Sequence, residues 1–211
     1  VPAHCDLRLT ADRVEWLQQL DKAPQTLTSY LDQIRPRRLG LYHEALWHFF
    51  LQQDEQIELI AHNCQVQGAK GTLGEFDVIY QNKASGDFVH LELAFKLYLQ
   101  APGQAEQGLM QWLGPNVKDR LDRKLEHMLE HQTQLSNTEL GRQLLRDMGI
   151  AQVERQISLR GYLLKNSQDF QQPQAIKPRG VLNPNLQWGT WLPLSNVLSQ
   201  LDQFPRWMPL T

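Results

Sequence analysis

The chain has 211 residues and a formal net charge of −2, with 21 basic and 23 acidic residues. This length suits one domain, or one domain with an appendage, and it is ample for a sizeable core. The balanced charge excludes an overall basic surface that would attract nucleic acid at long range, although it leaves room for a local basic patch. Apolar runs stay short of transmembrane length, and no signal-peptide pattern opens the chain, so we expect no membrane contact. Two cysteines without a metal-binding spacing favour a cytoplasmic location.

The first quarter of the chain is predicted to be helical. Apolar residues at helical spacing predict helices over 11–21, 26–34 and 40–53, and the third pattern is the strongest. Glu44 lies within the apolar stripe of the third helix. It is either a flanking residue whose carboxylate reaches solvent or an acid directed at a functional site.

Three strands follow this helix. Alternating apolar residues predict strands over 56–67, 74–80 and 88–99, and a polar turn joins the last two into a hairpin. Every second side chain of a strand points to the same face. Glu75 and Asp77 therefore share one face of the first hairpin strand, and Glu92 and Lys96 share one face of the second.

The acids and the lysine of this hairpin have two interpretations. Buried carboxylates are costly unless they are paired, hydrogen-bonded or bound to metal, so their apolar surroundings favour a cation site with a catalytic ammonium. The alternative is a solvated hairpin face with one cross-strand ion pair. The spacing alone leaves both interpretations open.

The remainder of the chain adds helices and at least one strand. We predict helices over 117–134, 137–148 and 195–201, a strand over 154–165, and a short strand near Trp188. Ser136 or Asn137 is the expected cap of the second helix. The residues Trp188, Trp191 and Trp207 are expected to pack on the sheet, with base stacking as the functional alternative. The order of elements predicts an α/β fold with a central mixed sheet flanked by helices.

The order of acidic motifs resembles a known superfamily. An acid on a helix (Glu44), the run Gly74-Glu75-Phe76-Asp77, and then Glu92 and Lys96 on the next strand resemble the PD-(D/E)XK nuclease superfamily. A closer resemblance is to a bacterial family, domain-of-unknown-function family 1853. It is carried by the segments 39–44, 72–77, 90–99 and 114–121.

This resemblance implies a fold, a site and a cofactor. It implies a restriction-endonuclease-like core over 39–165, preceded by a helical segment over 1–38 and followed by a C-terminal extension over 166–211. The implied metal ligands for Mg²⁺ or Mn²⁺ are Asp77, Glu92 and Glu75, and the implied catalytic residues are Lys96, Glu44 and Gln132.

Two features depart from the superfamily pattern. No proline precedes Asp77, and three residues separate Glu92 from Lys96 where the usual pattern has one. We still expect the long lysine side chain to reach back toward Glu92.

The resemblance leads to a function with two alternatives. The expected function is metal-dependent hydrolysis of phosphodiesters in DNA, with RNA as the second choice and nucleic acid as the partner. The first alternative is a nucleic-acid-binding or scaffolding protein that kept the fold and lost the chemistry. The second is a domain whose acids serve an unrelated metal-dependent or small-molecule role. Fold alone does not decide among them.

Overall fold

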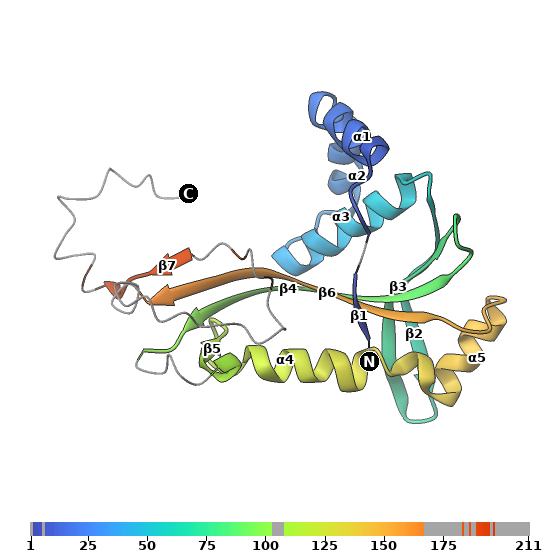
Figure 1. Ribbon diagram of the computed structural model, residues 1–211. Coiled ribbons are helices and arrows are strands. Elements are labelled where there is room, and N and C mark those ends of the chain that lie inside the picture. The colour runs from blue at the N-terminus through green and yellow to red at the C-terminus, as the bar shows by residue number, and fades with distance from the viewer. Residues whose placement is uncertain are drawn as a thin grey trace. The chain divides into compact units, whose positions relative to one another are not determined.

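Figure 1 shows the computed structural model of the chain, which describes residues 2–5, 7–102, 108–166, 183, 186, 189–194 and 196. Within these ranges the chain forms a mixed seven-stranded sheet flanked by five α-helices. This architecture is consistent with the expected restriction-endonuclease-like α/β fold. The chain divides into two compact units, one formed by Val1–Lys96 and Lys124–Arg160, the other by Leu97–Arg123 and Gly161–Thr211.

Helices open the first unit and return after the main strands. The α-helices are α1 (Ala11–Lys22), α2 (Gln25–Ile34), α3 (Leu39–Gln53), α4 (Leu121–His127) and α5 (Glu139–Asp147). A π-helix (Met128–Gln132) directly follows α4, and 3-10 helices cover Gly108–Gln111 and Leu135–Asn137. The helices predicted over 11–21, 26–34 and 40–53 are confirmed, as α1, α2 and α3.

The sheet is built around a long hairpin. The strands are β1 (Ala3–His4), β2 (Ile57–Gly68), β3 (Gly71–Asn82), β4 (Phe88–Gln100), β5 (Trp112–Leu113), β6 (Glu154–Asn166) and β7 (Gly189–Trp191). Their order is β1-β6-β4-β3-β2, with β5 on β4 and β7 on β6. The predicted strands over 56–67, 74–80, 88–99 and 154–165 are all confirmed. Strands β2 and β3 pair antiparallel from Ile57–Asn82 to Gly68–Gly71.

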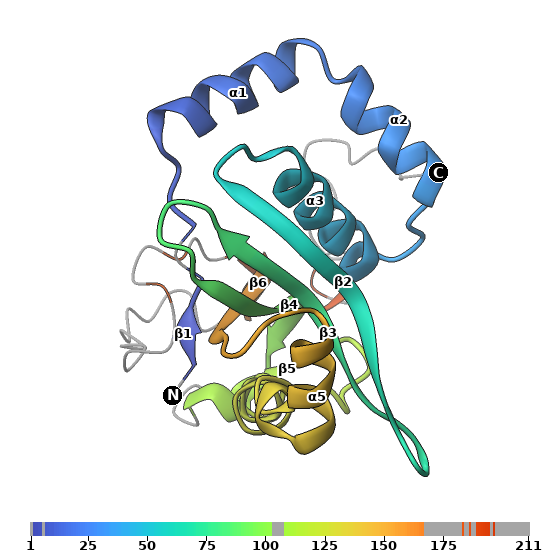
Figure 2. The same ribbon diagram turned by 90° about the vertical axis from the view of Figure 1, so that its right-hand side faces the viewer.

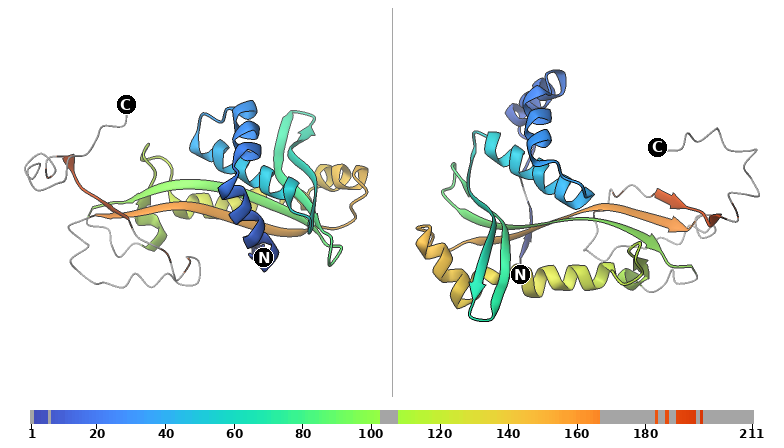
Figure 3. Two further views of the ribbon diagram at one scale, coloured as in Figure 1. Left: turned by 90° about the horizontal axis from the view of Figure 1, so that it is seen from above. Right: turned by 180° about the vertical axis from the view of Figure 1, so that it is seen from behind.

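Two apolar clusters cover opposite faces of the sheet in the first unit. Figure 2 shows α3 on one side of the β2–β3 hairpin and α5 on the other, and Figure 3 shows the same arrangement from behind. The buried cluster on the α3 side consists of Cys5, Leu51, Ile57, Val78, Tyr80, Val89, Leu91 and Leu93. The cluster on the α5 side consists of Val66, Phe76, Ile79, Leu135, Leu145 and Ile150. These clusters confirm that the helix bearing Glu44 and a later helix cover different faces.

Several predicted boundaries are wrong. The helix expected over 117–134 begins at Leu121 and widens into a π-turn at Met128. The cap of α5 is Thr138, whose hydroxyl oxygen accepts a hydrogen bond from the Gly141 N–H at 3.0 Å, because Leu135–Asn137 forms a separate 3-10 turn. The short N-terminal strand β1 was not expected.

The second unit contains one of the predicted tryptophan contacts. The indole N–H of Trp191 donates to the backbone carbonyl of Gln100 at 3.1 Å, which supports the expected packing on a strand. Trp188, Trp207 and, apart from Asn196, the helix predicted over 195–201 lie outside the described residues. In the described part of the chain, no helix is both long and apolar enough to span a membrane.

Candidate active site

The candidate site begins where the ladder between β3 and β4 ends. That ladder runs from the Gln81–Phe88 pair to the Val78–Leu91 pair. At the next position, Oδ2 of Asp77 accepts a hydrogen bond from the backbone N–H of Leu93 at 2.8 Å. Because a buried backbone N–H needs an acceptor, the Asp77 carboxyl group takes the place of a ladder carbonyl. Its side chain is thereby directed toward the Glu92 region of β4.

Glu92 is fully buried, and both of its carboxyl oxygens are engaged. Burial, with the Arg155 charge in addition, lowers the pKa of His90 to about 4, so His90 is neutral at neutral pH. Its Nε2 lies 2.7 Å from Oε1 of Glu92. Oε2 of Glu92 accepts from the side-chain amide of Gln132 at 2.6 Å, and the carbonyl oxygen of that amide accepts from Nζ of Lys124 at 2.8 Å. A chain of hydrogen bonds therefore joins the carboxylate to an ammonium.

Asp77 and Glu92 form a coupled pair of carboxyl groups. Burial is the main reason why the pKa of each rises to about 7, and the negative charge of Glu92 raises the pKa of Asp77 further. The two carboxyl groups share one proton, because burial disfavours two negative charges side by side. The positive charge of Lys124 lowers the pKa of both. The pair holds a proton near neutral pH that a bound cation would replace.

The helix acid Glu44 lies within electrostatic reach of this pair. Burial raises the pKa of Glu44, and the charges of Asp77 and Glu75 raise it further. Lys124 acts in the opposite direction. The structure thus brings the predicted acids Glu44, Glu75, Asp77 and Glu92 into one electrostatic cluster. Among the described residues, no group of three or more His, Cys, Asp or Glu side chains is arranged to hold a metal ion.

A buried histidine fixes the helix of Glu44 against β3. His48 lies one turn after Glu44 on α3, is only 4% exposed, and packs against the backbone of Asp77. Burial and the neighbouring His62, whose ring centroid is 4.2 Å away, lower the pKa of His48 to about 4. Residues four apart share a helix face, so the contact of His48 also turns Glu44 toward the acids.

A glycine in the acidic motif allows close packing beneath the site. A Cβ at Gly74 would come within 3.1 Å of the Leu135 side chain. Leu135 opens the 3-10 turn that closely follows the π-helix ending at Gln132. The absence of a side chain at Gly74 therefore lets β3 pass close to the segment that carries Gln132.

The two lysines of the region differ in their relation to the acids. Lys96 is half-buried on β4. It lies four residues along the strand from Glu92, which corresponds to about 13 Å between the two Cα atoms. Lys124 was not singled out from the sequence, where it belongs to the mixed charged face of the helix predicted over 117–134. An eight-residue spacing to Gln132 is no recognised helical pairing, so no sequence signal indicated the contact.

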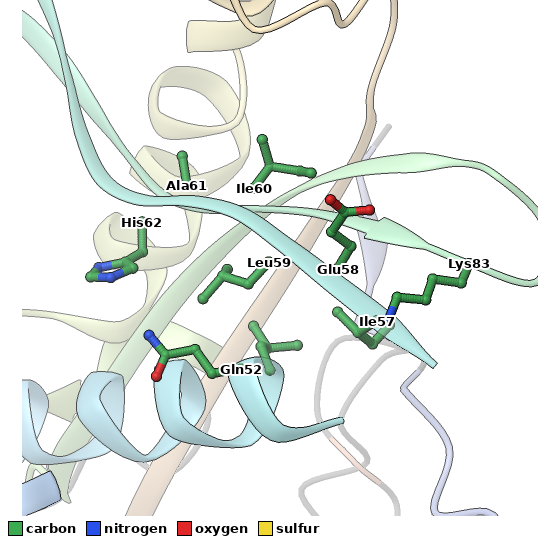
Figure 4. Close-up of a pocket in the computed structure, with 9 residues that line it drawn as sticks. Gln52, Ile57, Glu58, Leu59, Ile60, Ala61, His62 and Lys83 are labelled. Atoms are coloured by element: carbon green, nitrogen blue, oxygen red, sulfur yellow. The ribbon is translucent and has the colours of Figure 1, made fainter. Parts of the chain in front are cut away.

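A groove lies elsewhere in the first unit. It has a volume of about 540 Å³ and runs along β2 and the end of α3, as Figure 4 shows. The lining residues are Leu51, Gln52, Ile57, Glu58, Leu59, Ile60, Ala61, His62 and Lys83. None of the predicted site residues lines this groove, so the acidic cluster is a separate feature.

Comparison with known proteins gives one match. The family model described as "Domain of unknown function (DUF1853)" matches residues 3–211. No curated protein and no solved structure matches the chain. Because the family match covers nearly the whole sequence, the chain belongs to the DUF1853 family.

Proposed function

We propose that the protein is a metal-dependent nuclease of the PD-(D/E)XK type. Its proposed substrate is the phosphodiester backbone of DNA, with RNA as the second choice. The observation that carries this proposal is the coupled carboxyl pair of Asp77 and Glu92, held at the end of a strand ladder and joined by hydrogen bonds to a lysine ammonium. Perturbed carboxyl groups of this kind concentrate at functional sites. A cytoplasmic location belongs to the same proposal.

The donor set fits Mg²⁺ or Mn²⁺. Mg²⁺ takes oxygen ligands, keeps several waters and is usually held by one or two carboxylates together with substrate phosphates. Asp77 and Glu92 would supply those carboxylates, and Glu75 or Glu44 would add negative charge nearby. A bound ion of this kind supplies an activated water and offsets charge on the phosphate.

Gln132, Glu44 and a lysine have distinct roles in the proposed hydrolysis. Gln132 holds Oε2 of Glu92 in place through its 2.6 Å hydrogen bond. Glu44 is half-buried and has a raised pKa, which suits a group that accepts a proton from the attacking water. A lysine ammonium stabilises the negative charge on the phosphate during the attack, and the resemblance assigns this part to Lys96.

A second candidate function follows from a different observation. No preassembled group of three potential metal ligands exists among the described residues. This favours a nucleic-acid-binding or scaffolding protein that kept the fold and lost the metal chemistry. The two candidates differ in one measurable property, which is metal-dependent cleavage.

The test is a cleavage assay on end-labelled single- and double-stranded DNA and RNA with Mg²⁺, Mn²⁺ or EDTA. The matched pair of variants is Glu92→Gln, which removes a buried carboxylate, and Glu130→Gln, which removes an exposed one. We expect cleavage by the wild type and by Glu130→Gln, and none by Glu92→Gln or in EDTA. Cleavage by Glu92→Gln at the wild-type rate would refute the assignment of this site. Nucleic-acid binding without any cleavage would favour the second candidate.

A further inference from the structure

We propose that Lys124, and not the strand lysine Lys96, supplies the ammonium that binds the phosphate group in this site. The inference rests on the proposed function, because it names the cation of the same acidic site. It gives α4 and the following π-helix a direct role, whereas the superfamily resemblance places the ammonium on β4.

The first argument is the hydrogen-bond geometry. Nζ of Lys124 lies 2.8 Å from Oε1 of Gln132, and Nε2 of Gln132 lies 2.6 Å from Oε2 of Glu92. One amide thus accepts from the ammonium and donates to the carboxylate. This arrangement fixes the orientation of the amide and holds the ammonium at one end of a chain that begins at a predicted metal ligand.

The second argument is the reach of the Lys124 charge. It acts on Asp77 and Glu92 and also on the helix acid Glu44. These acids come from β3, β4 and α3, so a single ammonium influences groups on three separate elements. A phosphate bound at the acids would lie within reach of the same charge.

The third argument is the helix geometry that aligns Lys124 with Gln132. In a continuous α-helix, residues eight apart lie about 80° away from a common face. Here the segment Met128–Gln132 is a π-helix, and the Thr133 N–H donates to the carbonyl of Met128, five residues earlier, at 3.0 Å. The wider turn holds more residues, which brings Gln132 back toward the face of Lys124. π-turns inside helices are frequent at functional sites.

The ammonium has a defined chemical task. Cleavage of a phosphodiester concentrates negative charge on the phosphate oxygens, and a fixed cation beside the site stabilises that charge without reorganisation. The half-buried position of Lys124 limits the water that would screen it.

The test compares Lys124→Met, Lys124→Arg, Lys96→Met and the exposed control Lys118→Met in the full chain. The probe is thymidine 5′-monophosphate, titrated by calorimetry in saturating Mg²⁺, alongside Mn²⁺ titrations of each variant. We expect Lys124→Met to weaken binding of the monophosphate about tenfold or more while it still binds Mn²⁺. Lys124→Arg should retain most of the affinity, Lys118→Met should match the wild type, and Lys96→Met should lose far less affinity than Lys124→Met. Lys124→Met should also lower the cleavage rate about 100-fold.

The outcomes separate this inference from the proposed function. Loss of monophosphate binding in Lys96→Met but not in Lys124→Met would overturn the inference and leave the proposed nuclease standing. Equal loss of monophosphate binding in Lys124→Arg and Lys124→Met would also overturn the inference, because a positive charge at this position would then not be enough to bind the phosphate. A wild type that binds neither Mn²⁺ nor the monophosphate would overturn both.

Discussion

Replacing Asp77 by asparagine should stabilise the metal-free protein at alkaline pH. The pKa of Asp77 rises from 3.8 to about 7, mainly because the group is buried and next because Glu92 lies beside it. The folded protein therefore binds a proton that the unfolded chain has already released above about pH 4. Asparagine keeps an oxygen that accepts the Leu93 N–H and removes the ionisation.

The size of the effect follows from the pKa change. At about 1.4 kcal/mol for each pH unit, the rise from 3.8 to about 7 corresponds to about 4 kcal/mol for ionising Asp77 in the fold. Asp77 shares this cost with Glu92. Replacing Asp77 alone should therefore recover roughly half of the lost stability, or about 2 kcal/mol, above pH 7. At about pH 5 the folded wild type holds the proton, but the unfolded chain has mostly released it, so the gain should be smaller, roughly 40% of its value well above pH 7, and should vanish only below about pH 4.

The assay is urea unfolding of the wild type and Asp77→Asn in EDTA, at about pH 5 and about pH 8. The control is Asp122→Asn. Two hydrogen bonds from Arg120, at 2.6 and 2.7 Å, lower the pKa of Asp122. Asp122→Asn should therefore destabilise the folded protein, and the loss should stay below about 1 kcal/mol because the position is partly exposed. A stabilisation by Asp77→Asn that is the same at both pH values, or a destabilisation at pH 8, would refute the reasoning.

Three further predictions concern stability. Asp54→Ala should cost about 3 kcal/mol, because it leaves the buried guanidinium of Arg13 without its 2.7 Å partner; a change in the urea midpoint within error would contradict this. Gly141→Ala should lower the melting temperature, since its Cβ would collide with the Leu135 carbonyl oxygen, and an unchanged melting temperature would show that α5 can shift. The pKa of His48 falls from 6.5 to about 4, so its contribution to the free energy of unfolding is full above pH 6.5 and is lost as the pH falls toward 4. His48→Gln should therefore flatten the dependence of stability on pH between these values. An unaltered pH dependence in this variant would contradict the role of His48.

The main elements of the fold could be predicted because their patterns are local. The apolar spacing of α3 and the alternation of β3 and β4 need no knowledge of the rest of the chain. Strand parity also placed Asp77 and Glu92 where a hairpin brings them together. The separate 3-10 turn at Leu135–Asn137, after which α5 is capped by Thr138, packs its Leu135 side chain against the distant Gly74, and local reasoning did not reach it.

The candidate site was predictable only in part, for a physical reason. The acids lie on regular elements, so their faces follow from period two and period 3.6. The partner of Gln132 depends on a π-turn, which changes the helical period, and no propensity rule marks where such a turn begins. Lys124 therefore looked like one charge among several on an exposed helix. No local pattern indicates that His48 packs against the backbone of β3.

The most direct test of the central claim is a calorimetric titration of the wild type, Asp77→Asn and Asp87→Asn with Mn²⁺. Asp77 belongs to the carboxyl pair, whereas Asp87 lies exposed in the turn between β3 and β4. We expect one Mn²⁺-binding event in the wild type and in Asp87→Asn that is lost or strongly weakened in Asp77→Asn. Identical titrations for all three proteins, or no binding by the wild type, would contradict a metal site at Asp77 and Glu92.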